Sequence, residues 1–473
     1  MHRLGLLDTA FLRMESSRTP MHVGGLMTFR LPKDAGPDYP STVVERLRAF
    51  PYMPAPFNCR IQWPLSRAMP PRWVEADTDV EYHIRHSALP HPGGERELGA
   101  LVSRLHSNAM DLNRPPWEMH IIEGLENNRF ALYLKAHHSA IDGMGAMKMV
   151  RTWLSPDPTE TRSPGEMTAA AEAERGPDAR RLQDASEQRN HHLRAALERS
   201  LQNGRLRVET ARDLAATFYR LGQGGDNSVI RAALRTPATP FNQRVTAQRR
   251  LGTQLLDLTR FQSIAERMDC TINDVVLTIC GSATRRYLQE QDALPEGPLT
   301  ASVPIALPRS DGRGGNAFSG FVCPLGTDID DPVERLQRIS TITHRTKEQM
   351  LCASSAALER FGSFGMAPLM LGQLTGTLPK WPPLFNVIVS NVVASKEKLF
   401  MMGAELESLY PMSILFDGYA LNLTVVGYAG RVCVGYTGCR DAIPSLQRLA
   451  VYTGEALSEL EDAVASRDDP LSA

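Results

Sequence analysis

Residues 136–143 read AHHSAIDG and stand where a predicted strand ends and a predicted helix begins. Before them, the segment RFALYLKA at 129–136 alternates apolar side chains onto one face, which is typical of a strand. After the paired histidines, we predict a helix over 142–153. Such a junction is rigid behind and open in front, so it is a favourable place for catalytic side chains.

The two adjacent histidines of this segment are expected to differ in function. Neighbouring residues that leave a strand point to opposite sides, so His137 and His138 do not both face one substrate. One is expected to act as a base and the other as a structural partner, because a neutral imidazole with a pKa of ~6.5 accepts a proton near neutral pH. Asp142 could fix the loop or pair with a cation, and Gly143 is expected to allow close backbone packing.

The rest of the chain also mixes strands and helices. The segment 117–124 (WEMHIIEG) is a predicted strand, and the paired asparagines in 125–128 favour a turn into the strand at 129–136. Further strands are predicted at 253–258, 299–307, 385–391, 420–427 and 431–437, the last two joined by a hairpin loop at 428–430. Helices are predicted at 259–269, 273–290 and 444–465. The chain is therefore of mixed α/β type, with antiparallel pairing expected in both halves.

A chain of 473 residues exceeds the ~250–300 residues that one hydrophobic core serves, so two domains are expected. We predict an N-terminal domain over 1–154, a polar helical connector over 155–213 and a C-terminal domain over 214–473. The connector opens with SPDPTETRSPGEM, which is typical of a loop, and continues as an exposed helix that carries His191 and His192.

Composition excludes several classes of function. The chain has 52 basic and 53 acidic residues and a net charge of −1, which does not fit a nucleic-acid partner. Seven scattered cysteines without a C-x-x-C pair predict neither a structural metal site nor a disulfide framework, and they favour a reducing, cytoplasmic compartment. We expect no signal peptide and no membrane-spanning helix, and peripheral association with a membrane stays open.

The run HHSAIDG resembles the HHxxxDG signature of the coenzyme-A-dependent acyltransferase superfamily. Five other segments narrow the resemblance to the bacterial wax ester synthase/diacylglycerol acyltransferase family. They are LLDTAFLRMESSRTPMHVGGLMTF at 6–29, RPPWE at 114–118, TINDVVL at 271–277, Val303-Pro304 with Gly315-Asn316, and FNVIVSN at 385–391. The sequence departs from the family pattern at two places. Asn391 is followed by Val-Val-Ala-Ser, where the family commonly has Val-Pro-Gly-Pro, and Arg309 is displaced by one position from the arginine of the family.

The resemblance implies two chloramphenicol-acetyltransferase-like domains with mixed sheets flanked by helices, and an active-site channel between them. His138 would be the general base, Asn273 the donor to the oxyanion, and His137, Asp142 and Gly143 would hold the loop. Asn386, Ser390 and Asn391 would bind substrate. Acyl-CoA would serve as co-substrate without a metal or other cofactor, and the acceptor would be a long-chain alcohol or a diacylglycerol.

Several of these residues also have simpler interpretations. Asn273 precedes an apolar-periodic segment and could be a helix N-cap, and Trp117 is expected in the core. Asn386 and Ser390 could line a tunnel or satisfy main-chain groups. Residues 351–378 could form a buried helix pair, the wall of an acyl-chain tunnel, or both.

Two other functions stay open at the level of sequence. The first is a condensation-type enzyme that takes its acyl group from a carrier protein. The second is a non-catalytic protein that binds lipid or coats lipid droplets.

Overall fold

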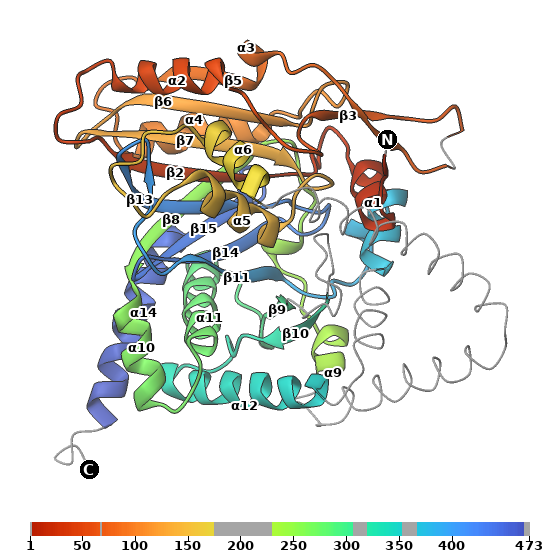
Figure 1. Cartoon of the computed structure of the whole chain (residues 1–473). Helices are drawn as coiled ribbons and strands as arrows, with labels where there is room; N and C mark the ends of the chain where they lie inside the picture. Colours follow the sequence, from red (N-terminus) through yellow and green to blue (C-terminus); the bar gives the residue numbers. More distant parts are fainter. Residues whose placement is uncertain (1, 67–68, 175–228, 306–318, 352–366, 468–473) are drawn as a thin grey trace.

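The computed structural model describes residues 2–66, 69–174, 229–305, 319–351 and 367–467 (Figure 1). These residues form two six-stranded sheets and one three-stranded sheet. In Figure 1 the sheet built mostly from the first half of the chain lies above the sheet of the second half, and helices cover their outer faces. The predicted fold class, two α/β halves with mixed sheets, is confirmed.

The first sheet receives most of its strands from the N-terminal half. In spatial order its strands are β12 (Phe400–Met401), β13 (Ala404–Met412), β2 (His22–Arg30), β7 (Arg129–His137), β6 (Trp117–Leu125) and β5 (Ile84–Ala88). Neighbouring strands are antiparallel except for the parallel pair of β5 and β6. The helices of the same half are α2 (Tyr39–Ala49), α3 (Val80–His83), α4 (Glu95–Ser107), α5 (Gly143–Trp153) and α6 (Pro164–Glu174). Of these, α4 contacts β8 (Arg249–Asp257) and α5 contacts β11 (Val387–Ser395) of the second sheet.

The second sheet belongs to the C-terminal half. Its spatial order is β10 (Ser319–Pro324), β9 (Thr300–Ile305), β11 (Val387–Ser395), β14 (Leu421–Tyr428), β15 (Arg431–Cys439) and β8 (Arg249–Asp257). β11 runs parallel to both of its neighbours, β9 and β14, and the other pairs are antiparallel. The accompanying helices are α9 (Val229–Leu234), η2 (Pro240–Asn242), α10 (Leu258–Arg267), α11 (Ile272–Glu290), α12 (Pro332–Leu351), η3 (Leu378–Lys380) and α14 (Gln447–Arg467).

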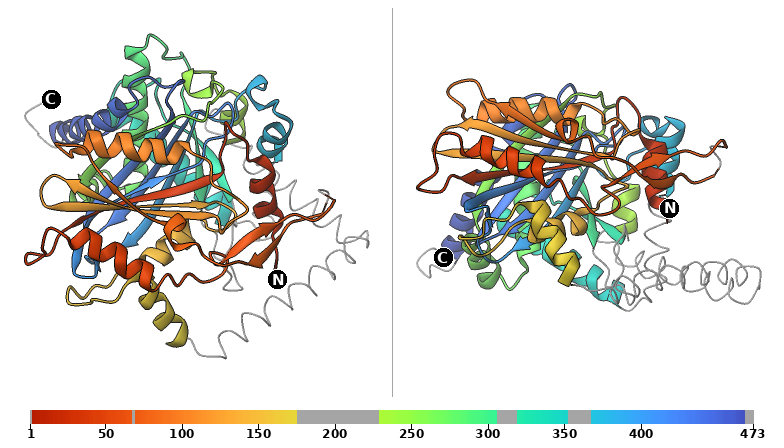
Figure 2. Two further views of the ribbon diagram at one scale, coloured as in Figure 1. Left: turned by 90° about the horizontal axis from the view of Figure 1, so that it is seen from above. Right: turned by 45° about the horizontal axis from the view of Figure 1, so that its top comes forward.

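A third, three-stranded sheet is formed by β1 (His2–Arg3), β4 (Arg72–Glu75) and β3 (Cys59–Gln62), in that spatial order. Helix α1 (Leu6–Met14) connects β1 to β2 of the first sheet. Figure 2 shows α1 at the edge of the molecule, where it meets both the first half and a helix of the second half at 367–375. α1 therefore belongs to the region where the two halves meet.

The C-terminal half contributes two strands to the first sheet, which the sequence patterns did not predict. β12 and β13 come from the C-terminal half but extend the first sheet, with Leu409 of β13 paired to Met27 of β2. The apolar core of the first sheet accordingly includes side chains from both halves, among them Leu406 and Leu409. The N-terminal half therefore does not complete its own sheet.

The strongest sequence patterns correspond to real elements. The hairpin of β6 and β7 and the hairpin of β14 and β15 are confirmed, and at the tip of the second hairpin Ala429 and Gly430 adopt positive φ angles of 45° and 77°. Trp117 is a core residue, as expected, and its indole Nε1 donates to the Phe57 carbonyl at 2.8 Å.

The predicted loop at 155–167 is partly wrong. Helix α6 begins inside it at Pro164, and Gly165 packs so tightly on Phe50 that an added Cβ would lie 2.2 Å from the Phe50 carbonyl oxygen. The domain boundaries at 154 and 213 stay a prediction. Several predicted features lie outside the described residues: the exposed helix of the connector with His191 and His192, Arg309, and the pair Gly315-Asn316.

The sequence predicts neither a membrane-spanning helix nor a disulfide framework. Among the described helices, none is both long and apolar enough to cross a bilayer. The six cysteines within the described ranges are all free thiols.

Candidate active site

The two histidines lie at the carboxyl end of β7, where the main chain is held from both sides. The amide of His137 donates to the Pro116 carbonyl at 2.9 Å, and the amide of His138 donates to the Met21 carbonyl at 2.8 Å. The imidazole of His137 is fully buried, whereas His138 keeps part of its surface exposed. The two side chains therefore have separate surroundings, as the strand geometry predicted.

His137 fastens the loop to the end of α1. Its Nδ1 accepts from the Ser139 amide at 3.1 Å and lies 2.7 Å from the Ser139 hydroxyl, so its proton belongs on Nε2. Nε2 then donates to the Glu15 carboxylate at 2.9 Å. Glu15 is the residue that ends α1.

His138 lies against an aromatic ring. Phe11 of α1 stacks on its imidazole with ring centroids 4.3 Å apart and an interplanar angle of 15°. Nδ1 of His138 has no contact with solvent. Burial lowers the pKa of His138 to about 4, and the neighbouring His137 adds to this, while a hydrogen bond to its own main chain and the charge of Asp142 act in the opposite direction. At neutral pH the imidazole is therefore unprotonated and able to accept a proton.

Asp142 caps the helix that follows the histidines. Its Oδ1 accepts from the amide of Gly145 at 2.7 Å, and this bond forms the N-terminus of α5. The close packing expected at Gly143 is wrong, because a Cβ added there would meet nothing within 4 Å. Gly145 is the tight position instead, with an added Cβ 3.1 Å from Oδ1 of Asp142.

Asn273 lies in the first turn of α11 and is not its N-cap. Thr271 has that position, since its hydroxyl accepts from the Asp274 amide at 3.2 Å and Asp274 Oδ2 accepts from the Thr271 amide at 2.9 Å. The N-cap interpretation of Asn273 was therefore off by two residues. Its side chain is half-buried at the start of the helix and is not needed for this capping box.

The three predicted substrate-binding residues, Asn386 directly before β11 and Ser390 and Asn391 within it, have different surroundings. Asn386 is fully buried, and its amide accepts from the Thr300 amide at 2.8 Å and donates to the Pro237 carbonyl at 2.7 Å and to Asn242 at 2.8 Å. Its polar atoms are thus engaged within the protein. Ser390 is half-buried and Asn391 is exposed on the same strand, beyond the short pairing with β9 that ends at Ile388.

An apolar cluster, here called the junction cluster, surrounds Phe11 and joins the two halves. Its buried members are Phe11, Met14, Met21, Leu369, Leu378, Phe385, Ile414, Phe416 and Tyr419. Two of them, Leu369 and Leu378, come from the segment 351–378 that was expected to form a buried helix pair or a tunnel wall. Residues 352–366 of that segment lie outside the described ranges.

A buried ion pair joins β6 to β7, the strand that ends at His137. Lys135 is paired with Glu118 across the two strands, with Nζ 3.0 Å from Oε2, and it also donates to the carbonyls of Leu105 and Asn108. Burial opposes ionisation, but His120 and Lys135 outweigh it and hold the pKa of Glu118 at about 2. Glu118 is the last residue of the RPPWE segment that carried the family resemblance. The sequence therefore drew attention to Glu118 but did not show that Lys135 is its partner.

Sequence reasoning did not single out Phe11 and Glu15. Both lie in the N-terminal segment that carried the family resemblance, and that segment was the signal available. Neither residue type is unusual in a helix, so their contacts with the histidines depend on where α1 packs.

The fold is that of a two-domain class that includes condensation domains. The first condensation domain of the calcium-dependent antibiotic synthetase matches 99% of this chain and 97% of its own, with a TM-score of 0.58 and 14% identity, which shows the fold alone. Within that class, the model of the wax ester synthase/diacylglycerol acyltransferase catalytic domain matches residues 4–276, and the model of the C-terminal domain of the same family matches residues 314–461. The chain belongs to the wax ester synthase/diacylglycerol acyltransferase family.

Individual relatives agree with this assignment over their full length. A Mycobacterium tuberculosis protein, provisionally named a diacylglycerol O-acyltransferase, is 46% identical over 98% of this chain and 99% of its own. The O-acyltransferase WSD of Acinetobacter baylyi is 34% identical over 99% of each chain. The wax ester synthase/diacylglycerol acyltransferase of Marinobacter aquaeolei VT8 has a TM-score of 0.77 and 35% identity over 98% of this chain and 100% of its own. The predicted family and the predicted enzyme class, an O-acyltransferase, are confirmed.

Proposed function

We propose that this protein transfers a fatty acyl group from acyl-CoA to a long-chain alcohol or to a diacylglycerol, with His138 as general base. The observation that carries the proposal is the place of the His138 imidazole, at the end of β7 and stacked on Phe11 of the junction cluster, and the lowered pKa of His138 agrees with it. Its full-length relatives are named for wax ester and diacylglycerol chemistry, which supports these two acceptors.

The proposed reaction is a direct transfer. His138 takes the proton of the acceptor hydroxyl as that oxygen attacks the thioester carbonyl carbon. Because Nδ1 is shielded from solvent, we assign the proton transfer to Nε2. The tetrahedral intermediate then collapses, the carbon–sulfur bond breaks, and the coenzyme A thiolate recovers the proton from His138. General-base assistance of this kind contributes roughly 10²–10⁴ in rate.

The other predicted site residues receive separate functions in this proposal. Asn273 at the N-terminal turn of α11 is the proposed donor to the oxyanion. His137 and Asp142 hold the loop, and Gly143 leaves the first turn of α5 open. Ser390 and Asn391 are the proposed contacts to substrate, whereas we propose that Asn386 shapes the site through its internal hydrogen bonds, among them those to Thr300, Pro237 and Asn242.

We further propose that acyl-CoA and the acceptor reach His138 from opposite ends of a channel between the two halves. No metal or additional cofactor takes part in the proposed reaction. A cytoplasmic protein with these substrates would meet its acceptor at a membrane surface or a lipid droplet, because long-chain alcohols and diacylglycerols reside in lipid.

The test is the release of coenzyme A from palmitoyl-CoA by the purified protein, with hexadecanol, with a diacylglycerol, or with neither. We expect acceptor-dependent release that falls by about 10²–10⁴ in His138→Ala. His344→Ala is a matched control, since His344 is an exposed histidine on α12. Release that is equal in wild type and His138→Ala would remove His138 from the reaction.

The shared fold with a condensation domain gives the second candidate its support. If palmitoyl-CoA gives no turnover with either acceptor but a palmitoyl carrier-protein thioester does, the donor is a carrier protein. If neither donor is turned over and the protein still binds neutral lipid, the function is non-catalytic.

A further inference from the structure

The N-terminal segment that resembles the family so closely has no function in the proposed reaction. Residues 6–22, here called the N-terminal arm, comprise α1 and the stretch that leads into β2. The arm crosses from the small sheet to the first sheet and lies beside the C-terminal half (Figure 1). The arm contacts both histidines of the site, through Phe11 and Glu15.

The middle of the arm touches the proposed base. Phe11 covers one face of the His138 imidazole at a centroid distance of 4.3 Å. Phe11 is itself immobilised, because it is buried in the junction cluster beside Phe385 and Phe416 of the C-terminal half. A ring held in this way fixes the plane of the imidazole and keeps water from that face.

The end of α1 touches the other histidine. Glu15 accepts from Nε2 of His137 at 2.9 Å, and its side chain is only 12% exposed. This bond selects the tautomer in which Nδ1 of His137 accepts from the Ser139 amide. The turn that carries His138 is thereby tied to the same helix that supplies Phe11.

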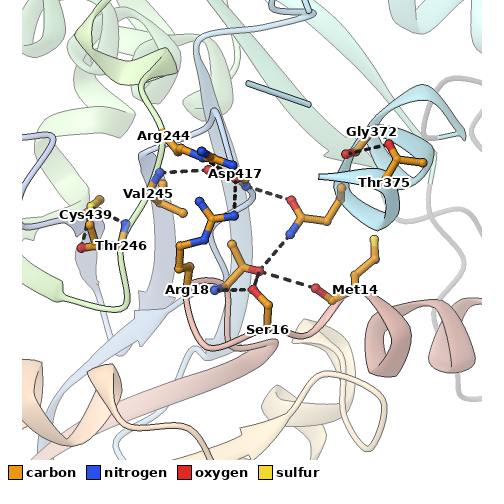
Figure 3. Close-up of polar contacts among 12 residues, drawn as sticks. Met14, Ser16, Arg18, Arg244, Val245, Thr246, Gly372, Thr375, Asp417 and Cys439 are labelled. Atoms are coloured by element: carbon orange, nitrogen blue, oxygen red, sulfur yellow. Dashed lines mark hydrogen bonds and ion pairs between the residues drawn. The ribbon is translucent and has the colours of Figure 1, made fainter. Parts of the chain in front are cut away.

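The arm is anchored beyond α1 by a buried polar network (Figure 3). Thr19 accepts from Gln373 Nε2 at 2.9 Å, and Gln373 Oε1 accepts from the Asp417 amide at 2.9 Å. The carboxylate of Asp417 lies 3.2 Å from Arg18 and accepts from the Val245 amide at 3.1 Å. Every partner of the arm in this network belongs to the C-terminal half, so the arm joins the site to that half.

We propose that Phe11 and Glu15 are positioning residues for His138 and His137, and that the N-terminal arm completes the active site only when it is docked on the C-terminal half. This inference rests on the proposed function of His138. Neither residue contacts the reacting atoms in the proposal; each acts through the histidine that it touches.

The proposal has a consequence for the titration of His138. Within the described residues, the charged or titratable groups that act on this imidazole are His137, beside it in the chain, and Asp142, at the start of α5. Glu15 reaches it through His137. Phe11 contributes burial without charge. Removing the ring therefore admits water, and the pKa of His138 rises toward the ~6.5 of a solvated imidazole.

The experiment compares Phe11→Leu with Leu12→Ala in the full chain. Leu12 is the next residue of α1 and is buried as well, but it packs against Leu4 and Ile61 on the other side of the helix. We expect Phe11→Leu to lower kcat by about tenfold to a hundredfold with little change in the KM for palmitoyl-CoA. The acid limb of its pH profile should move upward, whereas Leu12→Ala should lose thermal stability and keep the wild-type profile.

A second pair of variants tests Glu15. Glu15→Gln keeps an acceptor for Nε2 of His137, and Glu15→Leu removes it. We expect Glu15→Gln to retain most of kcat and Glu15→Leu to lower it by about tenfold or more. An equal loss of kcat in Glu15→Gln and Glu15→Leu would contradict the proposal that Glu15 positions His137 through a hydrogen bond.

A readout without turnover separates the inference from the proposed function. The titration of His138 is followed by NMR in protein labelled at the histidine rings, with His138→Ala used for assignment. A rise in the pKa of His138 in Phe11→Leu, absent from Leu12→Ala, supports the positioning even if the chosen substrates are wrong. An inactive His138→Ala together with identical profiles and titrations in the two α1 variants would overturn this inference and leave the proposed function standing.

Discussion

Asp142 accepts a hydrogen bond from the main-chain amide of Gly145 at 2.7 Å, and this bond starts α5 four residues after His138. The carboxylate is thus used for capping, which distinguishes it from the acid of a charge-relay triad. The amide of His138 is fixed independently by the Met21 carbonyl at 2.8 Å. The loop between the two residues is therefore held at both ends.

Replacing Asp142 tests whether capping or charge is required. Asp142→Ala should lower the free energy of unfolding by about 0.5–2 kcal/mol, because the first turn of α5 loses its acceptor. Its kcat should fall with it as the loop loosens. Asp142→Asn keeps an acceptor oxygen and should remain close to wild type in both measurements, urea unfolding and coenzyme A release.

Asp157→Ala is the control for this pair. Asp157 makes a similar bond to the Thr159 amide at 2.9 Å, but it lies in the loop beyond the other end of α5. Its loss should leave kcat unchanged. Equal inactivation of Asp142→Asn and Asp142→Ala would show that the charge itself is needed.

The pH dependence of the reaction follows from the burial of His138. Burial lowers the pKa of His138 to about 4. Because the base must be neutral to accept a proton, activity should persist as pH falls and be lost only near pH 4. We expect kcat/KM for palmitoyl-CoA to stay level between about pH 8 and pH 5 as far as this group is concerned. The measurement is a pH profile in a constant-ionic-strength buffer, with tryptophan fluorescence at each pH to verify that the protein is folded. An acid limb at about 6.5 would show a solvated imidazole.

The start of α11 allows catalysis and stability to be separated. Thr271→Ala removes the N-cap and should cost about 0.5–2 kcal/mol of stability. Asn273→Ala leaves the capping box intact, so its unfolding transition should match that of wild type. If Asn273 stabilises the oxyanion as proposed, its kcat falls by about 10²–10³. A kcat within about twofold of wild type would assign that stabilisation elsewhere.

The link between Thr19 and Gln373 is expected to contribute to stability across the two halves. Gln373→Leu removes the donor to Thr19 and leaves the Asp417 amide without its acceptor, which should cost about 1–3 kcal/mol. Combining it with Thr19→Val should cost less than the sum of the two single changes, as a double-mutant cycle in urea unfolding would show. Gln289→Leu, at an exposed position of α11, is the control. Additive costs would mean that the two side chains are not coupled.

The parts of the fold that sequence predicted are those that depend on local pattern. The β6–β7 and β14–β15 hairpins combine alternating apolar residues with turn residues that tolerate positive φ, such as Asn127 and Gly430. The long helices α11 and α14 were predicted for the same reason. The insertion of β13 beside β2 was not predicted, because the partner of a strand depends on packing between segments that are far apart in the sequence.

The site shows the same division between local and distant effects. The motif located the histidines and the expected loop-holding position of Asp142, whose bond to the Gly145 amide spans three residues; that this bond caps α5 was learned from the structure. Whether Asn386 faces substrate or the protein depends on Pro237 and Asn242, which a local pattern does not place. The close packing expected at Gly143 lies two residues later, at Gly145, where an added Cβ would meet Asp142.

The buried pair of Lys135 and Glu118 should contribute to stability in a way that depends on pH. Lys135→Met removes the nearest cation from the buried Glu118 carboxylate, which then keeps Arg85 and His120, each at 3.6 Å; this should lower the free energy of unfolding by about 1–3 kcal/mol at neutral pH. Glu118→Gln combined with Lys135→Met removes both charges and should cost less than Lys135→Met alone. Lys398→Met breaks an exposed pair with Glu405 and should change little.

The sign of the pH effect follows from the pKa of Glu118. In wild type it is lowered from 4.5 to about 2, so its contribution is fully present above about pH 4.5 and is lost as pH falls toward 2. In Lys135→Met the Glu118 carboxylate loses part of the attraction that lowered its pKa, so that pKa moves upward and protonation at low pH relieves the weakly compensated charge. Urea unfolding at about pH 7, 5 and 4 should therefore show the gap between wild type and Lys135→Met narrowing as pH falls. A gap that is constant over this range would mean that the lost stability comes from packing of the lysine stem and its carbonyl contacts, with no contribution from the charge of Glu118.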